Sequence, residues 1–229
     1  MARYSTGEST KNNIYETCRR LFYENGFDGT AYSQILRESG VNPGTFSYHF
    51  KNRENVARII CTEYIGRQHE WVDAHFPLMS EDERAVLAQC IFRRLMYDDE
   101  KLYRFFSETA SHNLGTDVLE EYKSTYVSGY SLFRSVMGDE QADIFFAASS
   151  GMATTLEPYL YERRNVLSFE KCAHYSINAY LMYLRPREDL SKSIDRALAI
   201  VDGILIENNG FDVTLTDVTG FGADGTPKA

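Results

Sequence analysis

Apolar residues recur along most of the chain at intervals of three and four positions, with little strict alternation. That spacing is typical of amphipathic α-helices. Ile14, Cys18, Leu21 and Phe22 form the first apolar stripe, and Gly26 is placed to end that helix. Prolines are few, with five in the whole chain, so long segments run without a helix breaker. The pattern therefore predicts a nearly all-helical protein.

Three more helices are predicted within the first 75 residues. Thr30 can cap a short helix that stops at Gly40. Asn42 and Pro43 open the next helix, because Asn is a favoured N-cap and Pro fits the first helical position. Asn52 can cap a fourth helix. The spacing thus predicts two short helices followed by a longer one.

The remaining predicted helices are longer and are separated by turn signals. Their spans are 81–97, 99–113, 117–137, 139–163, 169–184 and 190–208. The tail is rich in Gly, Asp and Thr and contains a short alternating stretch, so we expect it to be mobile or an edge strand. The predicted fold class is all-α with about nine to ten helices. A three-helix helix-turn-helix domain (1–52) precedes a larger helical bundle (53–208) and a mobile tail (209–229).

Composition and charge narrow the range of functions. Hydrophobic residues make up 43% of the chain and charged residues 25%, as in ordinary globular proteins. The net charge is −9, yet residues 1–60 hold eight basic and six acidic residues. An acidic whole argues against general coating of nucleic acid, whereas a slightly basic N-terminal part permits one dedicated DNA-binding surface. The polar N-terminus and the lack of a long apolar run predict a cytoplasmic protein that does not bind membranes.

Catalytic and metal-binding patterns are missing from the sequence. Four cysteines lie far apart, without a C-x-x-C pair: Cys18, Cys61, Cys90 and Cys172. We expect them to be free thiols rather than metal ligands or disulfides. His69 and Asp73 share a helix face and could bind a metal, although a solvated helix end is the simpler interpretation. With no Gly-rich phosphate loop or nucleophile motif, we expect no enzyme activity, cofactor or metal.

The most informative segment spans residues 30–50. A tight turn at Ser39-Gly40-Val41 joins two short helices, which is helix-turn-helix geometry, and the second helix of such a unit enters the major groove of DNA. Phe46 and Phe50, four residues apart, can share the buried face of that helix. Its exposed side offers hydrogen-bonding side chains, namely Asn42, Thr45, Ser47, Tyr48 and His49. Lys51 and Arg53 follow, where positive charge could meet phosphate.

A set of spaced residues within 10–58 repeats a known pattern: Ile14, Leu21-Phe22, Gly26-Phe27, Thr30, Ile35, Gly40-Val41, residues 44–50 and residues 53–56. In residue type and spacing, this set resembles the DNA-binding domain of the TetR family of regulators. The resemblance covers about a fifth of the chain. It implies a regulator that binds double-stranded DNA.

The resemblance implies the following DNA contacts: Thr30, Ser33, Gln34, Asn42, Pro43, Gly44, Thr45, Ser47, Tyr48, His49 and Lys51. Thr30 would cap the second helix and bond phosphate. Ser47 occupies a position at which the family usually has tyrosine, and the neighbouring Tyr48 is the candidate substitute. Lys51 would act through its charge on the DNA backbone. The candidates for base readout are Asn42, Thr45 and Tyr48.

The resemblance also implies a homodimer on an inverted-repeat operator, formed by the last two long helices of a four-helix bundle. The matching segments here are 139–163 and 169–184. The candidate interface residues are Phe145, Phe146, Ser149, Ala153, Leu156, Cys172, Ser176, Ala179, Tyr180 and Tyr183. The alternative for each of them is a place in the core of one protomer.

Members of this family usually hold an effector pocket in the helical body, and this body is rich in aromatic residues. The candidate pocket residues are Trp71, Phe92, Met96, Tyr103, Phe106, His112, Tyr126 and Tyr130. The alternative for each ring is simple core packing. The acidic body would favour a cationic effector.

The resulting hypothesis is a repressor that a small-molecule effector releases from a palindromic operator. One alternative is a regulator of the same fold that a protein partner controls. A more remote alternative is an all-α enzyme.

Overall fold

The computed structural model describes residues 2–112, 114, 138–181, 187–217 and 220–228. These residues form nine helices and one two-stranded sheet. Their bounds are α1 (Ala2–Asn25), α2 (Tyr32–Ser39), α3 (Pro43–Phe50), α4 (Arg53–His75), α5 (Glu81–Asp98), α6 (Glu100–Ser111), α9 (Asp139–Glu162), α10 (Phe169–Leu181), α11 (Arg187–Val201), β1 (Ile204–Asn209) and β2 (Asp212–Asp217). The expected all-α class is confirmed, with one small hairpin added. The helix predicted over 117–137 lies outside the described residues, as do Tyr126, Tyr130 and Tyr183.

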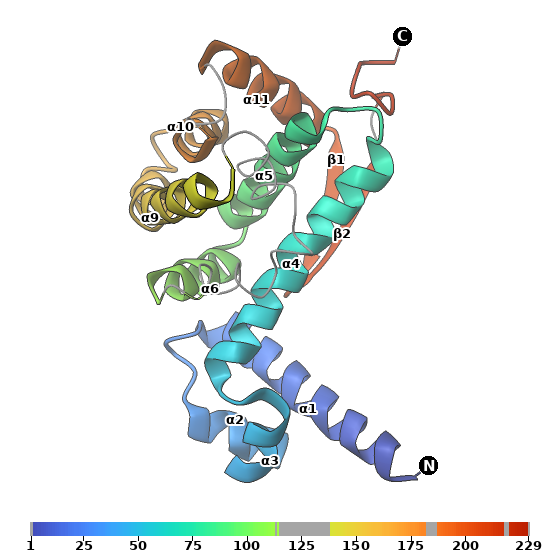
Figure 1. Cartoon of the computed structure of the whole chain (residues 1–229), viewed down its shortest axis with the longest axis vertical. Helices are drawn as coiled ribbons and strands as arrows, with labels where there is room; N and C mark the ends of the chain where they lie inside the picture. Colours follow the sequence, from blue (N-terminus) through green and yellow to red (C-terminus); the bar gives the residue numbers. More distant parts are fainter. Residues whose placement is uncertain (1, 113, 115–137, 182–186, 218–219, 229) are drawn as a thin grey trace.

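The helices form two groups that the long helix α4 joins. Figure 1 shows α1, α2 and α3 together at one end of the molecule, and α4 rising from them into the rest of the chain. In the larger group, α5 is central and packs against α4, α10 and α11. The helix α6 lies between this larger group and α1, and it contacts α1, α5 and α9. The sequence order of helices therefore becomes a small domain and a bundle with α6 at their junction.

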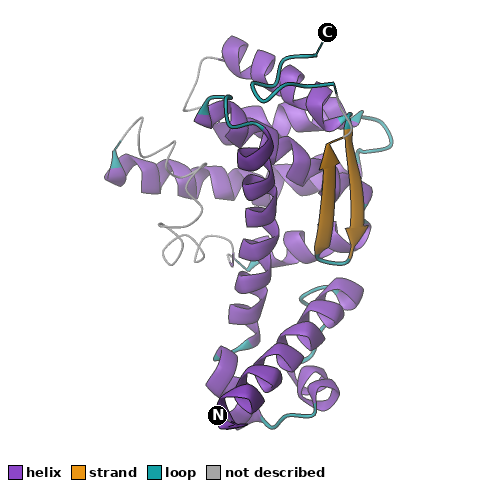
Figure 2. Ribbon diagram, turned by 90° about the vertical axis from the view of Figure 1, so that its right-hand side faces the viewer, coloured by secondary structure: helices purple, strands orange, loops and turns teal. Residues whose placement is uncertain are grey.

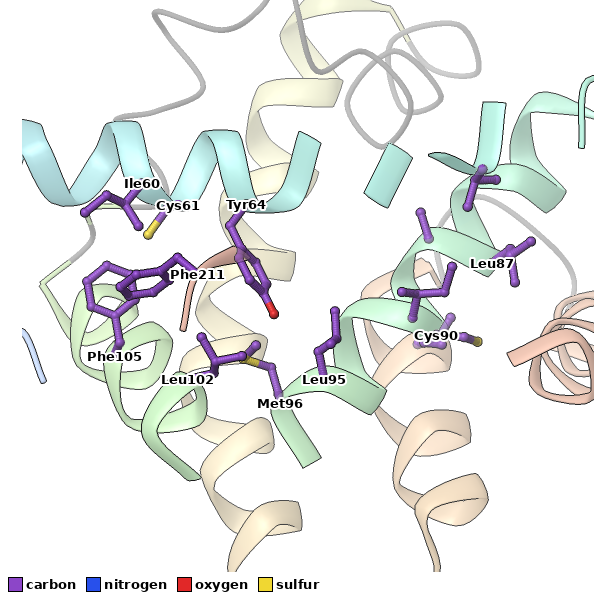
Figure 3. Packing of buried hydrophobic residues seen from close by; sticks show 14 of the residues in the cluster. Ile60, Cys61, Tyr64, Leu87, Cys90, Leu95, Met96, Leu102, Phe105 and Phe211 are labelled. Carbon is purple, nitrogen blue, oxygen red and sulfur yellow. The ribbon is translucent and has the colours of Figure 1, made fainter. Parts of the chain in front are cut away.

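The core explains why α5 is central. Its residues Leu87, Cys90, Ile91 and Leu95 are all buried, because helices pack against it on several sides. Figure 3 shows part of this packing, with α5 side chains continuing toward Leu102 and Phe105 of α6. One apolar cluster extends from the first helix to the last. Burial of this continuous apolar surface is the main favourable term that holds the two groups together.

The C-terminal end differs from the sequence prediction. The helix predicted over 190–208 ends at Val201, and β1 begins at Ile204. β1 pairs antiparallel with β2, with Ile206 opposite Leu215. The two-residue loop begins with Gly210 at φ 66°, which glycine adopts without steric cost. Alternating burial along the strands, set by packing on the bundle, prevails over the helical interpretation of the same residues.

The segment predicted as a mobile tail contains β2 in its first part, residues 212–217. The alternative expectation, an edge strand, is confirmed by the hairpin that runs beside α4 in Figure 2. Further along, the N–H of Leu78 donates to the carbonyl of Ala223 (3.1 Å), and Arg196 donates to the carbonyl of Gly225 (3.1 Å). These bonds attach residues 220–228 to the loop between α4 and α5 and to α11.

The described residues bear on two other classes of protein, those that cross membranes and those that bind metal ions. Within the described part of the chain, no helix combines the length and apolar character that a bilayer crossing requires. The same residues contain no group of three or more His, Cys, Asp or Glu placed to hold a metal ion. Asp73 instead pairs with Arg84 (2.8 Å), and burial lowers the pKa of His69, which disfavours its charged form.

Candidate nucleic-acid interface

The turn between α2 and α3 has the predicted geometry. Gly40 adopts the left-handed conformation (φ 69°), and its N–H donates to the carbonyl of Leu36. The hydroxyl of Ser39 is buried and donates to the carbonyl of Ile35 (2.7 Å). The side chain of Asn13 in α1 donates to the carbonyl of Ser39 (2.7 Å). The turn is thus held both by its own backbone and by α1.

The start of α3 also forms as predicted. The side-chain oxygen of Asn42 accepts a hydrogen bond from the N–H of Thr45 (2.9 Å), and Pro43 occupies the first helical position. Phe46 and Phe50 are buried, and Phe46 lies edge-on to Tyr32 of α2 (5.1 Å between ring centroids). One face of α3 therefore anchors the helix, and the opposite face is left to the solvent.

The predicted contact residues divide by exposure. Those exposed to solvent are Ser33, Asn42, Pro43, Gly44, Ser47, Tyr48 and Lys51. Those partly buried are Gln34, Thr45 and His49. Tyr48 is 85% exposed, although large hydrophobic rings are usually covered. Its ring lies edge-on to that of His49 (5.0 Å). Most of the predicted contacts are therefore accessible to solvent.

Thr30 departs from the prediction. Ala31, not Thr30, occupies the N-cap position of α2, and no side chain caps that helix. The side chain of Thr30 is fully buried, and its hydroxyl donates to the carbonyl of Gly26 (2.7 Å), with the carbonyl of Leu21 3.1 Å away. The loop after α1 folds back, so this hydroxyl satisfies carbonyl groups at the end of α1. The prediction of a cap is wrong, and the hydroxyl does not face the solvent from which phosphate would approach.

Arg53 also has a different role from the one its sequence position suggested. Its guanidinium donates to the carbonyls of Phe27 (3.1 Å) and Thr30 (2.6 Å). It also lies over the ring of Phe27, 4.3 Å from the centroid. Arg53 therefore ties the start of α4 to the loop between α1 and α2. Lys51, directly after α3, remains an exposed cation.

A cavity of about 270 Å³ lies in the larger group of helices. Its described lining comes from α4, α5, α6, α9 and α10, and it includes Phe92, Met96, Tyr103 and Phe106 of the predicted set. Trp71 and His112 do not line it. Trp71 stacks on His75 (4.2 Å), because both lie on one face of α4 near its end, and His112 bonds to Asp28 (2.7 Å). Rings and one thioether thus form much of the cavity wall.

The cavity lining includes a paired charge that the sequence did not indicate. Arg93 of α5 and Glu157 of α9 form a salt bridge (3.0 Å), and the Arg93 side chain is only 10% exposed. Arg93 also donates to the carbonyl of Gln89 (3.2 Å), and Ser176 hydrogen-bonds to both members of the pair. The guanidinium is therefore already occupied on several sides by groups of this chain.

The helix α6 faces the cavity on one side and α1 on the other. Arg104 donates to the carbonyl of Glu24 (2.6 Å), and Glu108 accepts from the N–H of Asp28 (3.0 Å). His112, two turns after Arg104, completes this row against Asp28. Sequence reasoning missed these links because the partners lie about 80 positions apart in the chain.

The predicted dimer residues fall into three groups. Cys172 and Ser176 are buried, and both face the interior of this chain near α5 and α9. Leu156 and Ala179 are partly buried. Side-chain positions lie outside the described part of the chain for Phe145, Phe146, Ser149, Ala153, Tyr180 and Tyr183. Cys172 and Ser176 are therefore core residues of one protomer, which was the alternative expectation.

A different stripe of α9 is exposed. Ile144, Ala148, Gly151, Thr155 and Tyr159 recur at helical spacing and all face the solvent. Of the seven most exposed large hydrophobic residues that the structure describes, four lie on α9, on α10 or in the loop between them: Ile144, Tyr159, Val166 and Tyr175. The sequence prediction chose a neighbouring face of α9, the one with Phe145, Ser149 and Ala153. Small residues among aromatic residues occur on that face and on the exposed one, so periodicity did not separate the two faces.

Known proteins share the N-terminal pattern. The family model described as "Bacterial regulatory proteins, tetR family" matches residues 14–58. The chain is 28% identical over 122 residues to the probable HTH-type transcriptional regulator YttP of Bacillus subtilis (strain 168), covering 52% of this chain and 58% of that protein. It is 23% identical over 128 residues to the HTH-type transcriptional regulator QacR of Staphylococcus aureus (strain Mu50 / ATCC 700699), covering 52% of this chain and 66% of that protein.

The chain also resembles solved structures. A gamma-butyrolactone receptor (ArpA like protein) aligns over 84% of this chain and 98% of its own, with a TM-score of 0.40 and 18% identity. The chain thus spans little more than half the length of YttP. The helix-turn-helix geometry and the match over residues 14–58 agree. Residues 14–58 of this chain therefore match the DNA-binding part of the tetR family of bacterial regulatory proteins.

Proposed function

We propose that this protein is a dimeric repressor that binds an inverted-repeat operator through α3 and is released by a small molecule in the cavity. The observation that carries DNA binding is the two-sided nature of α3. Phe46 and Phe50 bury one face, and an exposed row that includes Ser47 and Tyr48 projects from the other. A short helix of this kind, anchored behind and polar in front, suits the major groove.

The proposed contacts divide into base readout and backbone attraction. The side-chain oxygen of Asn42 is used in the cap, so its NH₂ group remains to donate to a base or phosphate. Tyr48 offers both an exposed ring and a hydroxyl. The ammonium of Lys51 would act on the DNA backbone, where its effect does not depend on base sequence. Thr30 and Arg53 are excluded from this set, since the side chains of both donate hydrogen bonds to backbone carbonyls of the segment between α1 and α2.

Selection of bound DNA from a random pool tests the proposal. We expect the selected sequences to contain an inverted repeat, because a two-fold dimer presents two copies of α3. With the selected DNA, Lys51→Ala should weaken binding and lower the slope of log affinity against log salt by about 1. The matched control is Lys192→Ala, an exposed lysine on α11. Equal affinity for selected and random DNA at moderate salt would contradict DNA binding.

The cavity supports an effector that is aromatic and uncharged. Rings of Phe92, Phe106 and Tyr103 supply apolar surface. Arg93 and Glu157 neutralise each other, so an anionic ligand would have to displace the carboxylate and a cationic ligand the guanidinium. This argument favours a neutral ligand over the cationic one that the acidic composition suggested.

Three naphthalene probes that share one ring system test the effector proposal: 2-naphthamide, 2-naphthoate and 2-naphthylmethylammonium. We expect the amide to raise the melting temperature and to weaken operator binding more than either charged probe. In Glu157→Gln, the unpaired Arg93 should shift the preference toward the naphthoate. If none of the three probes changes the melting temperature or operator binding, the result would favour the alternative, a regulator of this fold controlled by a protein partner.

The helix α6 gives the proposed effector a route to the DNA-binding helices. Phe106 and Tyr103 line the cavity, while Arg104 and Glu108 of the same helix bond to the end of α1 and to the loop after it. A ligand that displaces α6 would therefore shift α1 relative to α4. Effector and operator would then stabilise different conformations, and coupling of about 1–3 kcal/mol is typical of such systems.

A further inference from the structure

The tip of the β-hairpin, residues 208–212, lies where α1, α4 and α6 meet. This tip joins β1 to β2 and includes Gly210, whose backbone passes close to the ring of Tyr23 in α1. Figure 2 shows the hairpin extending along α4 toward the N-terminal helices. We call residues 208–212 the clasp. Its side chains contact elements of both the DNA-binding end and the bundle.

The central apolar contact of the clasp is Phe211. This ring is 4% exposed and lies edge-on to Phe105 of α6, with 4.7 Å between centroids. It is also edge-on to Tyr23 of α1 (5.9 Å) and to Tyr64 of α4 (6.2 Å). Figure 3 shows Phe211 among Phe105, Tyr64 and Ile60. One side chain from near the C-terminus thus fills the junction of three helices.

Charged and polar contacts surround this ring. The carboxylate of Asp212 accepts from Arg19 of α1 (2.6 Å) and from Arg67 of α4 (2.8 Å), so one oxygen bridges the two helices. On the other side, Asn208 donates to Asp99 (2.6 Å), the residue before α6. The hydroxyl of Tyr23 donates to the same carboxylate oxygen (2.9 Å). The clasp therefore joins α1 to α4 and α6 by three separate sets of contacts.

We infer that the clasp fixes the orientation of the DNA-binding helices on the bundle and thereby sets operator affinity and its response to the effector. The inference rests on the proposed function. A docked clasp limits the orientations that α1, and with it α3, can adopt. A dimer that presents two recognition helices at a fixed spacing then loses less entropy on binding its operator.

The clasp also touches the helix that borders the cavity. Phe105, which contacts Phe211, is adjacent in sequence to Phe106, which lines the cavity, and their rings lie 5.3 Å apart. A shift of α6 caused by a ligand would therefore change how Phe211 packs against Phe105. The clasp is in this way placed to respond to the cavity and to act on α1.

Two substitutions separate the clasp from the rest of the hairpin. Asp212→Asn removes the bridging charge at an exposed position and leaves the core intact, whereas Phe211→Ala removes the buried ring. The matched controls are Glu207→Gln and Leu205→Ala, which change exposed positions on β1 of the same hairpin. Asp212→Asn keeps the inference testable if Phe211→Ala fails to fold.

The measurements are operator affinity and the ratio of affinities without and with 2-naphthamide. We expect Asp212→Asn and Phe211→Ala to weaken operator binding about tenfold and to reduce the effector ratio toward one, since the orientational restraint is lost. Both controls should match the wild-type protein. Clasp variants that match the controls in both quantities would overturn the inference.

Hydrogen exchange of the free protein provides a readout that does not depend on DNA. In Asp212→Asn, amides of α1 and of the first half of α4 should exchange faster, while those of α10 and α11 remain as in the wild type. If the wild-type protein binds no DNA, the proposed function fails while this measurement still tests the clasp. Unchanged exchange in α1, or an equal increase throughout the chain, would show that the clasp does not hold the DNA-binding helices.

Discussion

At the scale of single residues, Lys51 combines an unusual backbone with an exposed charge. Its φ of 69° lies in the region that L-residues avoid, and no other described non-glycine residue has a positive φ. The N–H of Asn52 donates to the carbonyl of Phe50 (2.7 Å), which closes a γ-turn centred on Lys51. Gamma-turns with positive φ are rare and strained. The chain accepts this strain where α3 passes into α4, next to the proposed DNA surface.

Replacing Lys51 with glycine should separate stability from DNA binding. Lys51→Gly should raise the free energy of unfolding by about 1 kcal/mol, because glycine adopts positive φ without a Cβ clash. It should also weaken DNA binding through the lost charge. Urea denaturation and a salt titration of binding measure the two effects. The control, Lys192→Gly within α11, should lower stability by about 1 kcal/mol, and a loss of stability in Lys51→Gly would refute the strain argument.

Thr30 illustrates how burial changes the role of a side chain. Its hydroxyl serves the carbonyl of Gly26, so Thr30→Val should cost about 1–2 kcal/mol of stability by leaving a buried acceptor unpaired. The exposed Ser33→Ala should cost less than about 0.5 kcal/mol. Denaturant titration measures both values. A steeper loss for Ser33→Ala than for Thr30→Val would show that the buried bond is not the stabilising one.

At the scale of elements, the hairpin is held to α1 and α4 through Asp212. Burial alone would raise the pKa of this carboxyl, but hydrogen bonds from Arg19 and Arg67 outweigh that effect and lower it. A lowered pKa in the folded state means that the carboxylate stabilises the fold above the unfolded pKa of about 3.9. This stabilisation is lost as the pH falls through the lower, folded pKa.

The difference in free energy of unfolding between the wild type and Asp212→Asn should therefore depend on pH. Asp212 is largely exposed, so the variant should lose no more than about 1 kcal/mol of stability between pH 5 and 8. This difference in stability between the wild type and the variant should begin to shrink below about pH 4, as the wild-type carboxyl takes up its proton. Urea denaturation across this pH range gives the difference, with Glu207→Gln expected to track the wild type. A gap that widens in acid would contradict the assignment.

At the scale of the whole molecule, the exposed stripe of α9 is the face best suited to a second copy of this chain. A Cβ added to Gly151 meets no described atom within 4 Å, so the space beside it is open in one protomer. Ile144 and Tyr159 flank it with exposed apolar surface. Small residues between apolar ones allow two helices to approach closely.

Gly151→Arg should therefore convert a dimer into monomers without unfolding the protein. The added side chain fits each protomer but would lie within the interface, where an unpaired charge is costly. Sedimentation velocity measures the mass, and circular dichroism checks the helix content. Ala199→Arg, at an exposed position on α11, is the matched control and should remain dimeric. If Gly151→Arg remains a dimer, the interface does not include this face of α9.

Much of the fold follows from local signals. The caps at Asn42 and Asn52 were predictable, because each side chain bonds to an N–H only three residues away. The turn at Gly40 and the buried pair Phe46 and Phe50 follow equally from short-range geometry. The end of α11 was not predictable in this way, because the strand at 204–209 depends on its pairing with β2 and on packing against the bundle.

The sequence by itself determined the helical class, the helix-turn-helix and the exposed face of α3, since these depend on spacings of three and four residues. Tertiary structure alone decided which polar groups face solvent and which serve the protein. Thr30 became an internal bond, Arg93 was paired with Glu157, and Asp212 was brought to Arg19 from 193 positions away. Contacts of that range depend on how the helices pack, and packing energies sum over the whole core rather than over any one segment.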